Sequence, residues 1–390
     1  MSRPGSPLEA PKQEHTYPEH DFPVNLFKAM ESVRGGCNVL LSPFSIAQAL
    51  TLIVVGSQGP THDQILKILG EADEASLNKK FDAAKPDVLG HKIQFLLGNR
   101  LYARPPHSVL STYAKAIQSV HGDSSELTPE NKKNVTNVNA WVSGITKRRL
   151  SKAVTESSSL PDLLVINAVY FRGVWASRFE RELVFKSPFY VKGDETVTVD
   201  MMFSRRDTPF LSAKEFDCQV LELPYDGNNC SMVLFLPNLR DGLHHMMSQI
   251  TSENLGKALS NLRKKDKVEV FLPKFHFSQQ HEMAAELNKL GITDAFDPVK
   301  ADLSKMLKTP TGSAIGQLVH DVALEIDEDG TEILAAHAGK VQRKSTICGP
   351  EFRVDHPFLF VLVTRPGNVV LFMGAIWRPP PAMPSDSEIS

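Results

Sequence analysis

The sequence predicts an α+β fold, because helical patterns dominate the first third of the chain and strand patterns dominate the rest. Strands and helices do not alternate regularly, which argues against a doubly wound sheet. No linker rich in Pro, Gly or Ser divides the middle of the 390 residues. We therefore expect one large domain over residues 21–378, flanked by disordered tails at 1–20 and 379–390.

Helices are predicted where apolar residues recur at helical spacing. The first helix begins at Asp21 and presents Leu26 and Met30 on its apolar face. Ser42 is suited to cap a helix over 44–56, with Pro43 at its first position. The same spacing predicts helices over 62–69, 111–120, 131–149, 241–261 and 282–290.

Strands are predicted where apolar residues alternate with polar ones or form short runs. Residues 163–171 are apolar almost throughout, which suits a fully buried central strand. A strand over 267–277 is limited by Pro273. The remaining strands are predicted over 38–41, 93–102, 196–202, 219–223, 230–236, 318–326, 358–364 and 369–373.

The composition is that of an ordinary globular protein, with 42% hydrophobic and 23% charged residues. A net charge of −2 argues against a general nucleic-acid binder. No apolar run is long enough to span a membrane. We expect a monomer with no nucleic-acid or membrane partner.

The four cysteines are too few and too widely spaced for a disulfide scaffold or a zinc site. We expect free thiols, and Cys348 lies in a segment where a thiol would be accessible. The first 20 residues have no apolar core of a signal peptide. Two N-glycosylation sequons, at Asn134 and Asn229, favour a secreted glycoprotein whose signal peptide has been removed. The alternative is a cytoplasmic protein.

The segment 321–360 contains a long loop between two strands. Its first strand ends in acidic residues at Glu328 and Asp329, and small residues follow. A basic cluster comes next, at Arg343 and Lys344, before the apolar strand that begins near Phe358. A loop of roughly 20 residues in a compact domain is normally functional or disordered. This one offers a dibasic target to a protease.

Motifs of common catalytic sites are absent from the sequence. The chain has no nucleophile elbow, no phosphate-binding glycine loop and no HExxH zinc motif. His281 and Glu282 lack the second histidine of that motif, and His244 and His245 are adjacent rather than at ligand spacing. The sequence therefore predicts neither an enzyme nor a metal or cofactor site.

Six ordered motifs resemble the serpin family of serine protease inhibitors. They are NVLLSPFSI at 38–46, NAVYFRGVW at 167–175, VFLPKF at 270–275, VHDVA at 319–323, an acidic-Gly-Thr-Glu segment at 328–332, and DHPFLF at 355–360 with FMG at 372–374. The resemblance runs from about residue 21 to 378. It implies a fold of three β-sheets and about nine helices with an exposed reactive centre loop over about 328–352.

The resemblance also implies a mechanism. A protease cleaves the loop, the freed segment enters the central sheet as a new strand, and the protease is trapped as an acyl-enzyme. The hinge of the loop would consist of Glu328, Asp329, Gly330, Thr331, Glu332, Ile333, Leu334, Ala335 and Ala336.

The family's scissile residue lies sixteen positions after Glu328, which is Lys344, with Ser345 after the cut. Arg343 is the alternative if the loop shifts by one residue. A lysine there fits a protease whose specificity pocket carries a carboxylate, so the expected partner is a trypsin-like serine protease.

Ile333 and Leu334 depart from the small residues that inhibitory members carry after the hinge. Strand alternation places Ile333 on the same face as Thr331 and Ala335. On an inward face Ile333 would overpack a small site at a cost of roughly 1–3 kcal/mol. We expect inhibition with a substantial fraction of the chain cleaved as plain substrate. The alternative is a non-inhibitory serpin that acts as a carrier, a chaperone or a signalling module.

Two further sites are implied. The polar cluster that holds the family's central sheet closed would be Ser42, Ser45, Asn167 and His320, with Trp175 where insertion begins. The densest basic run, Arg263, Lys264, Lys265 and Lys267, is a candidate for binding a polyanion such as the glycosaminoglycan heparin.

Overall fold

The computed structural model describes residues 20–82, 89–156, 159–328 and 349–380. The expected N-terminal tail lies outside these residues except for His20, and the C-terminal tail except for Pro379 and Pro380. The loop from Asp329 to Cys348 also lies outside them.

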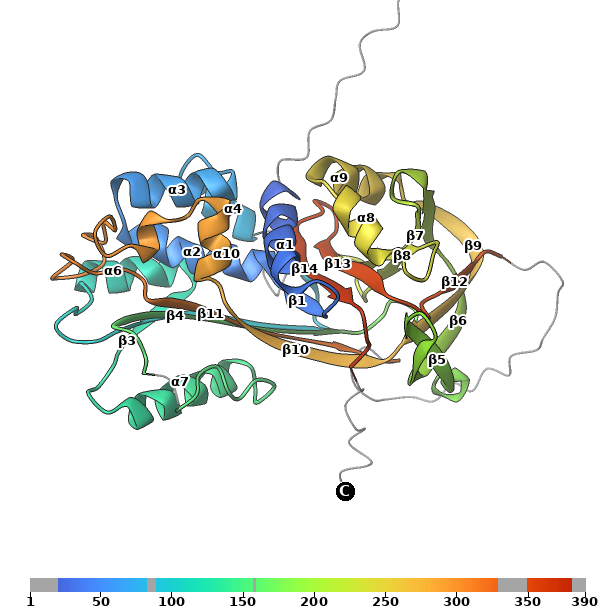
Figure 1. Cartoon of the computed structure of the whole chain (residues 1–390), viewed down its shortest axis with the longest axis horizontal. Coiled ribbons are helices and arrows are strands. Elements are labelled where there is room, and N and C mark those ends of the chain that lie inside the picture. The colour runs from blue at the N-terminus through green and yellow to red at the C-terminus, as the bar shows by residue number, and fades with distance from the viewer. Residues whose placement is uncertain (1–19, 83–88, 157–158, 329–348, 381–390) are drawn as a thin grey trace, which may run out of the picture.

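Helices form at both ends of the molecule (Figure 1). The α-helices are α1 (Asp21–Arg34), α2 (Pro43–Gly56), α3 (Gly59–Leu69), α4 (Glu74–Asp82), α6 (Ser111–Ala116), α7 (Asn131–Ile145), α8 (Leu243–Gln249), α9 (Ser252–Asn261) and α10 (Ala284–Leu290). Single turns of 3-10 helix are η2 (Ile117–Val120), η3 (Arg181–Leu183), η4 (Lys214–Phe216) and η5 (Asp294–Phe296).

Strands make up most of the rest. They are β1 (Val39–Leu41), β2 (Ile93–Ala103), β3 (Gly122–Glu126), β4 (Leu163–Gly173), β5 (Phe185–Lys192), β6 (Glu195–Ala213), β7 (Cys218–Pro224), β8 (Cys230–Pro237), β9 (Arg263–Pro273), β10 (Phe275–Glu282), β11 (Gln317–Ile326), β12 (Glu351–Arg353), β13 (Phe358–Thr364) and β14 (Val370–Ile376).

Within the residues that the structure describes, the strands form two continuous hydrogen-bonded networks. One has five strands in the order β10-β11-β4-β2-β3, and the other runs β1-β14-β13-β8-β7-β6-β9-β12, with β5 paired to β6. The second sheet is continuous because β6 is 19 residues long. Its first residues pair with β5, Met201–Phe210 pair with β9, and Phe210–Ala213 pair with β7, so one strand joins the two sheets that the family resemblance separates.

The five-stranded sheet is covered on both faces, as Figure 1 shows: α2 lies on one side and α7 on the other. Successive side chains of a strand point to opposite faces. Val165 and Val169 of β4 accordingly join the main core, whereas Leu164 and Ile166 join a smaller core that contains Val138 of α7. Any strand added to the middle of this sheet would be buried on both faces.

Two predicted elements each prove to be two elements. The helix predicted over 241–261 is broken into α8 and α9, because Thr251 is extended and its Oγ1 accepts a hydrogen bond from the N–H of Asn254, which caps α9. The strand predicted over 267–277 is β9 and β10, which belong to different sheets. Pro273 has no N–H to donate, and the chain changes sheets immediately after it.

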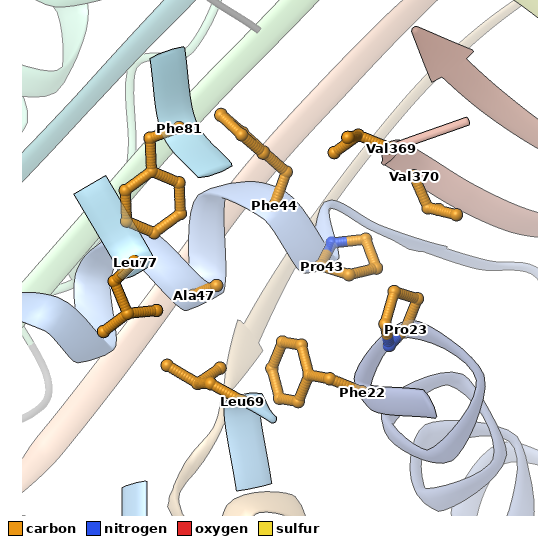
Figure 2. A pocket seen from close by; sticks show the side chains of 10 residues that line it. All are labelled: Phe22, Pro23, Pro43, Phe44, Ala47, Leu69, Leu77, Phe81, Val369 and Val370. Carbon is orange, nitrogen blue, oxygen red and sulfur yellow. The ribbon is translucent and has the colours of Figure 1, made fainter. Parts of the chain in front are cut away.

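The helical layer beside α2 encloses a small cavity of about 30 Å³. Figure 2 shows the apolar side chains that surround it, with Phe44 and Ala47 from α2 and Leu69 from α3 among them. No helix in the described ranges is long and apolar enough to cross a bilayer.

Candidate functional site

The central seam of the five-stranded sheet lies between β4 and β11. These strands are parallel over eight residue pairs, from Leu164↔Gln317 to Phe171↔Leu324. Their outer neighbours β2 and β10 are antiparallel to them. The chain leaves β11 at Ile326, is described as far as Glu328, and is described again from Gly349, just before β12 in the other sheet. The loop singled out in the sequence therefore begins at one end of this seam.

The direction of the two strands decides what can enter the seam. A segment that folds back after Ile326 would run antiparallel to β11, and also to β4, because β4 and β11 run the same way. Antiparallel ladders are slightly more stable per residue than parallel ones. One parallel pairing would be replaced by two antiparallel pairings, a net gain of about eight ladder bonds at roughly 1 kcal/mol each.

A row of polar side chains crosses the seam near its middle. His281 of β10 pairs with His320 of β11, His320 with Asn167 of β4, and Asn167 with Asn99 of β2. All four are buried, with 2% exposure or less. Strands that share such a row are held in one register, because a slip would leave buried polar groups unpaired.

His320 ties the seam to the helix beneath it. Its Nε2 accepts a hydrogen bond from the backbone N–H of Ser42 at 3.1 Å, so its proton resides on Nδ1, which donates to Oδ1 of Asn167 at 2.5 Å. Burial, with a smaller contribution from His281, lowers the pKa of His320 well below its usual value. The ring is therefore neutral, and a neutral ring alone can accept from Ser42.

The other predicted cluster residues meet at the same place. Oγ of Ser42 donates to the carbonyl of Leu371 at 2.6 Å, and Oγ of Ser45 donates to Oδ1 of Asn167 at 2.9 Å. The amide of Asn167 donates to Oδ1 of Asn99 at 2.6 Å. The structure thus brings Ser42, Ser45, Asn167 and His320 together and adds Asn99 and His281. Sequence reasoning missed those two because only strand register places them in the row.

Trp175 lies at the end of the seam where the loop begins. Its Nε1 donates to the backbone carbonyl of Asp327 at 2.8 Å, and its ring stacks on Tyr225 with centroids 4.4 Å apart. Arg172 of β4 donates to the carboxylate of the same Asp327 at 2.7 Å. These contacts hold Asp327, the residue directly after β11, against the end of β4 and the residues that follow it.

Glu325 of β11 contacts side chains from β4, from β10 and from the turn after α7 at this end of the sheet. Its carboxylate accepts from the hydroxyl of Tyr170 at 2.9 Å and pairs with Arg172 of β4 and with Arg149, which follows α7. His276 of β10 lies 3.6 Å away. Burial, followed by the charge of Glu325, raises the pKa of Tyr170, so its hydroxyl stays protonated and donates. The cluster closes the seam where an inserting strand would enter.

Glu328, the first residue of the predicted hinge, is also held. Its carboxylate pairs with Lys274 at 2.5 Å and with Arg181 at 3.4 Å, and its carbonyl accepts from the N–H of Phe179. The remaining hinge residues and the predicted reactive bond, Lys344–Ser345 or Arg343, lie outside the described residues, as does Cys348. The hinge and the bond remain predictions.

A simpler contact closes the foot of the seam. The N–H of Gly316, just before β11, donates to the carbonyl of Leu163 at 2.9 Å. A Cβ at Gly316 would lie 2.4 Å from Pro161, so this approach requires glycine. A cavity of about 430 Å³ lies beside this point, lined in part by Leu163 and Ile315. An added strand would arrive here after crossing the sheet.

The predicted glycosylation sites differ in their surroundings. Asn134 is 1% exposed; its Oδ1 accepts from the N–H of Thr128, and its Nδ2 donates to the carbonyl of that residue. An amide engaged in this way does not fit a glycan acceptor. Asn229 is half-buried in the turn between β7 and β8.

The residues of the predicted polyanion site are exposed. All of Arg263 to Lys267 lie at the start of β9. The described cysteines, Cys37, Cys218 and Cys230, are unpaired, and Cys37 is exposed. Among the described residues no three His, Cys, Asp or Glu side chains converge on a metal site.

Known proteins are similar to this chain in both sequence and fold. Residues 18–379 match the family model described as Serpin (serine protease inhibitor). Leukocyte elastase inhibitor A of Mus musculus is 32% identical over 376 residues, covering 92% of this chain and 97% of that protein. Serpin B8 of Homo sapiens is 31% identical over 370 residues, with the same coverage.

Solved structures are also similar to this chain in fold. Uncleaved ovalbumin superposes with a TM-score of 0.84 at 26% identity, covering 93% of this chain and 99% of that one. Serpin48 of the insect Tenebrio molitor, described as highly specific, gives 0.82 at 26% identity, covering 96% and 100%.

Proposed function

The chain belongs to the serpin family, and on that premise we propose that it inhibits trypsin-like serine proteases by strand insertion. The protease cleaves the loop after Lys344. The freed segment enters the seam between β4 and β11, and the acyl-enzyme is trapped before water releases it. The chain would act as bait and trap and would not itself be an enzyme.

The single observation that carries the proposal is the parallel pairing of β4 and β11 next to the start of the loop. This arrangement leaves a position in which a cleaved segment gains two antiparallel neighbours and covered faces on both sides. The contacts of Trp175 and Glu325 keep that position closed until the loop is cut.

Lys344 supports a trypsin-like target, since a lysine fits a specificity pocket that carries a carboxylate. Relatives named as leukocyte elastase inhibitors raise elastase as a second target. An elastase has a small specificity pocket and would not accept Lys344. An elastase would therefore cleave this loop at another bond.

Mixing the protein with equimolar trypsin or elastase tests the proposal. We expect an adduct with trypsin that survives SDS. We also expect mass spectrometry to show that the released C-terminal peptide begins at Ser345. A peptide that begins at Lys344 would identify Arg343 as the scissile residue. An adduct with elastase alone would contradict the trypsin-like target.

A non-inhibitory serpin is the second candidate, and Ile333 and Leu334 favour it. Such a protein would be cleaved as a plain substrate, without adduct and without a gain in thermal stability. It would then serve as a carrier, a chaperone or a signalling module.

We propose a cytoplasmic location rather than secretion. The unpaired and exposed Cys37 suits a reducing compartment, where such a thiol persists. The engaged side chain of Asn134 removes one of the two sequons that favoured secretion. Complete sensitivity of Cys37 to a thiol reagent in protein taken directly from cells supports this location. A glycan on Asn229 would contradict it.

A further inference from the structure

The start of β9 carries cations with different surroundings. Arg263 donates to the carbonyls of Ser260 and Leu262 at 2.7 and 2.8 Å, and Lys264 pairs with Asp207 at 3.7 Å. Within the described residues, Lys265 and Lys267 form no ion pair. We call these two residues the β9 cation pair. Both are exposed.

The backbone at the β9 cation pair is fixed. Lys267 has a positive φ of 54° and its N–H donates to Oδ1 of Asp207 at 3.0 Å. The ladder between β6 and β9 shifts register at this point, between Arg206 and Thr208. A bulge of this kind re-aims side chains at the edge of a sheet. The pair is therefore presented by a rigid strand rather than by a loose loop.

Neighbouring charges on this side of the sheet are already engaged. Arg205 pairs with Glu269, and Arg353 of β12 pairs with Glu351 at 2.9 Å while its guanidinium lies 3.5 Å from the ring centre of Phe271. Arg263 to Lys267 carry four cations and one carboxylate, Asp266, which is exposed between the two lysines. With Lys264 neutralised by Asp207, the start of β9 keeps a net positive charge, to which the β9 cation pair contributes. A partner with surface carboxylates complements it.

The β9 cation pair lies where the reactive loop rejoins the fold. A Cβ on Gly349 would lie 2.0 Å from the carbonyl oxygen of Lys267, so the two backbones touch. The N–H of Glu269 donates to the carbonyl of Pro350 at 3.0 Å, and β12 continues parallel to β9. Figure 1 shows β9 and β12 together at the end of the molecule opposite α7.

Chain length then limits where a docked protease lies. Three residues lie between Ser345 and Gly349, so the Cα atoms of these two residues are at most about 14 Å apart. A protease domain of roughly 230 residues has a radius of gyration of about 17 Å. A protease whose active site holds Lys344 and Ser345 must therefore lie over or beside the start of β9.

We propose that the β9 cation pair is a second contact surface for the target protease, which binds a carboxylate-rich patch on the body of that protease. The inference rests on the proposed function, because it assumes cleavage at Lys344–Ser345. It adds a determinant of target choice outside the loop: a trypsin-like protease with an acidic surface is preferred over one with a basic surface. Contacts of this kind act mainly on the association rate.

The test compares the wild type with the double variant Lys265→Glu/Lys267→Glu, using an anionic trypsin and a cationic trypsin as probes. With the anionic trypsin at low ionic strength we expect the association rate constant to fall about tenfold. It should not fall with the cationic trypsin. The difference should disappear near 0.5 M salt, where the screening length is only about 4 Å. Equal rate constants for wild type and variant with the anionic trypsin would overturn the proposal.

A matched control reverses two exposed lysines far from the loop, Lys132→Glu/Lys133→Glu in the first turn of α7. This variant has the same net charge, and its association rate should stay near that of the wild type. The number of inhibitor molecules consumed per protease should be equal in all three proteins, because the contact acts before acylation. An equal loss of rate in the control would assign the effect to net charge and overturn the proposal.

Polyanion binding is the competing role of the same lysines. It is measured as the salt concentration that elutes each protein from immobilised heparin. Earlier elution of Lys265→Glu/Lys267→Glu with unchanged protease rates would make the β9 cation pair a polyanion site and overturn the protease contact.

A binding assay tests the contact independently of inhibition. It measures the affinity of the wild type and of the double variant for an anionic trypsin whose nucleophilic serine is replaced by alanine. About tenfold weaker binding of the double variant supports the contact even where no SDS-stable adduct forms. Equal affinities would overturn the contact while leaving the adduct assay of the proposed function unaffected.

Discussion

The backbone N–H of Ser42, at the start of α2, donates a hydrogen bond of 3.1 Å to Nε2 of His320 on β11. This bond links the five-stranded sheet to the helix α2 that packs against it. Since both residues are fully buried, neither partner can turn to water when the bond breaks. The hydrogen bonds of the polar row should therefore stabilise the closed sheet, and each residue's contribution can be tested by substitution.

Replacing His320 by Ala should destabilise the closed sheet. The change leaves the Ser42 N–H without its acceptor and Asn167 Oδ1 without one donor, at a cost of about 2–4 kcal/mol. We expect the first unfolding transition in guanidinium to shift to lower concentration. The exposed His245→Ala on α8 is the control and should unfold like the wild type. Equal midpoints for both variants would contradict a locking role.

Trp175→Phe should ease the opening of the seam. The substitution removes the bond from Nε1 to the carbonyl of Asp327 and keeps an aromatic ring over Tyr225. A loss of about 1 kcal/mol corresponds to an insertion rate about fivefold higher. The rate is measured as uptake of a synthetic peptide with the sequence of residues 330–340, by mobility in a native gel. Trp141→Phe on α7 is the control. Peptide uptake by Trp175→Phe that is no faster than uptake by this control would contradict a role of Trp175 in keeping the seam closed.

Asp321 makes the stability of the native state depend on pH. Burial raises the pKa of its carboxyl to about 6, above the value of 3.8 expected in the unfolded chain. As pH falls, the folded state therefore binds a proton before the unfolded state does. The contribution of this residue to the free energy of unfolding rises as pH falls from about 6 to about 4. Above pH 6 the buried carboxylate destabilises the fold by about 2–3 kcal/mol.

Asp321→Asn should remove this dependence. The variant should be more stable than the wild type at pH 8, and the two should become equal near pH 4. His320 gives the opposite slope, because its lowered pKa costs stability below about pH 6.5, but it is present in both proteins and cancels in the difference. A stability difference that is the same at pH 4 and pH 8 would refute the assignment.

Ile333→Ala should make the trap more efficient. Both faces of the seam are covered, one by the main core and one by the core under α7, so Ile333 is buried on insertion whichever way it points. Removing its bulk relieves roughly 1–3 kcal/mol of overpacking and lets insertion outrun hydrolysis of the acyl-enzyme. Fewer inhibitor molecules should be consumed per trypsin inactivated. A ratio that stays constant or rises would show that Ile333 does not limit insertion.

Much of the fold and part of the site follow from the sequence. The N-cap at Ser42, the buried central strand β4 and the strand that precedes the loop all lie where local patterns predict them. Their signals are local: a capping hydroxyl before a proline, an apolar run, and a strand that ends in acidic residues. The polar cluster was reached by family resemblance rather than by pattern.

The rest depends on contacts between distant segments. Nothing near Glu325 in the sequence indicates that Arg149 and Tyr170 will meet it, because β4 and the turn after α7 approach it only in the folded chain. Asn99 likewise joins the polar row through register alone. The break at Thr251 was missed because apolar spacing continues across it and only the cap divides α8 from α9.

The most direct test of strand insertion is the thermal stability of the protein after its loop has been cut. Limited trypsin cleavage followed by calorimetry compares intact and cleaved chains of equal composition. About eight additional ladder bonds should raise the unfolding temperature by roughly 10 °C or more. A cleaved protein that unfolds at or below the temperature of the intact one would contradict insertion between β4 and β11.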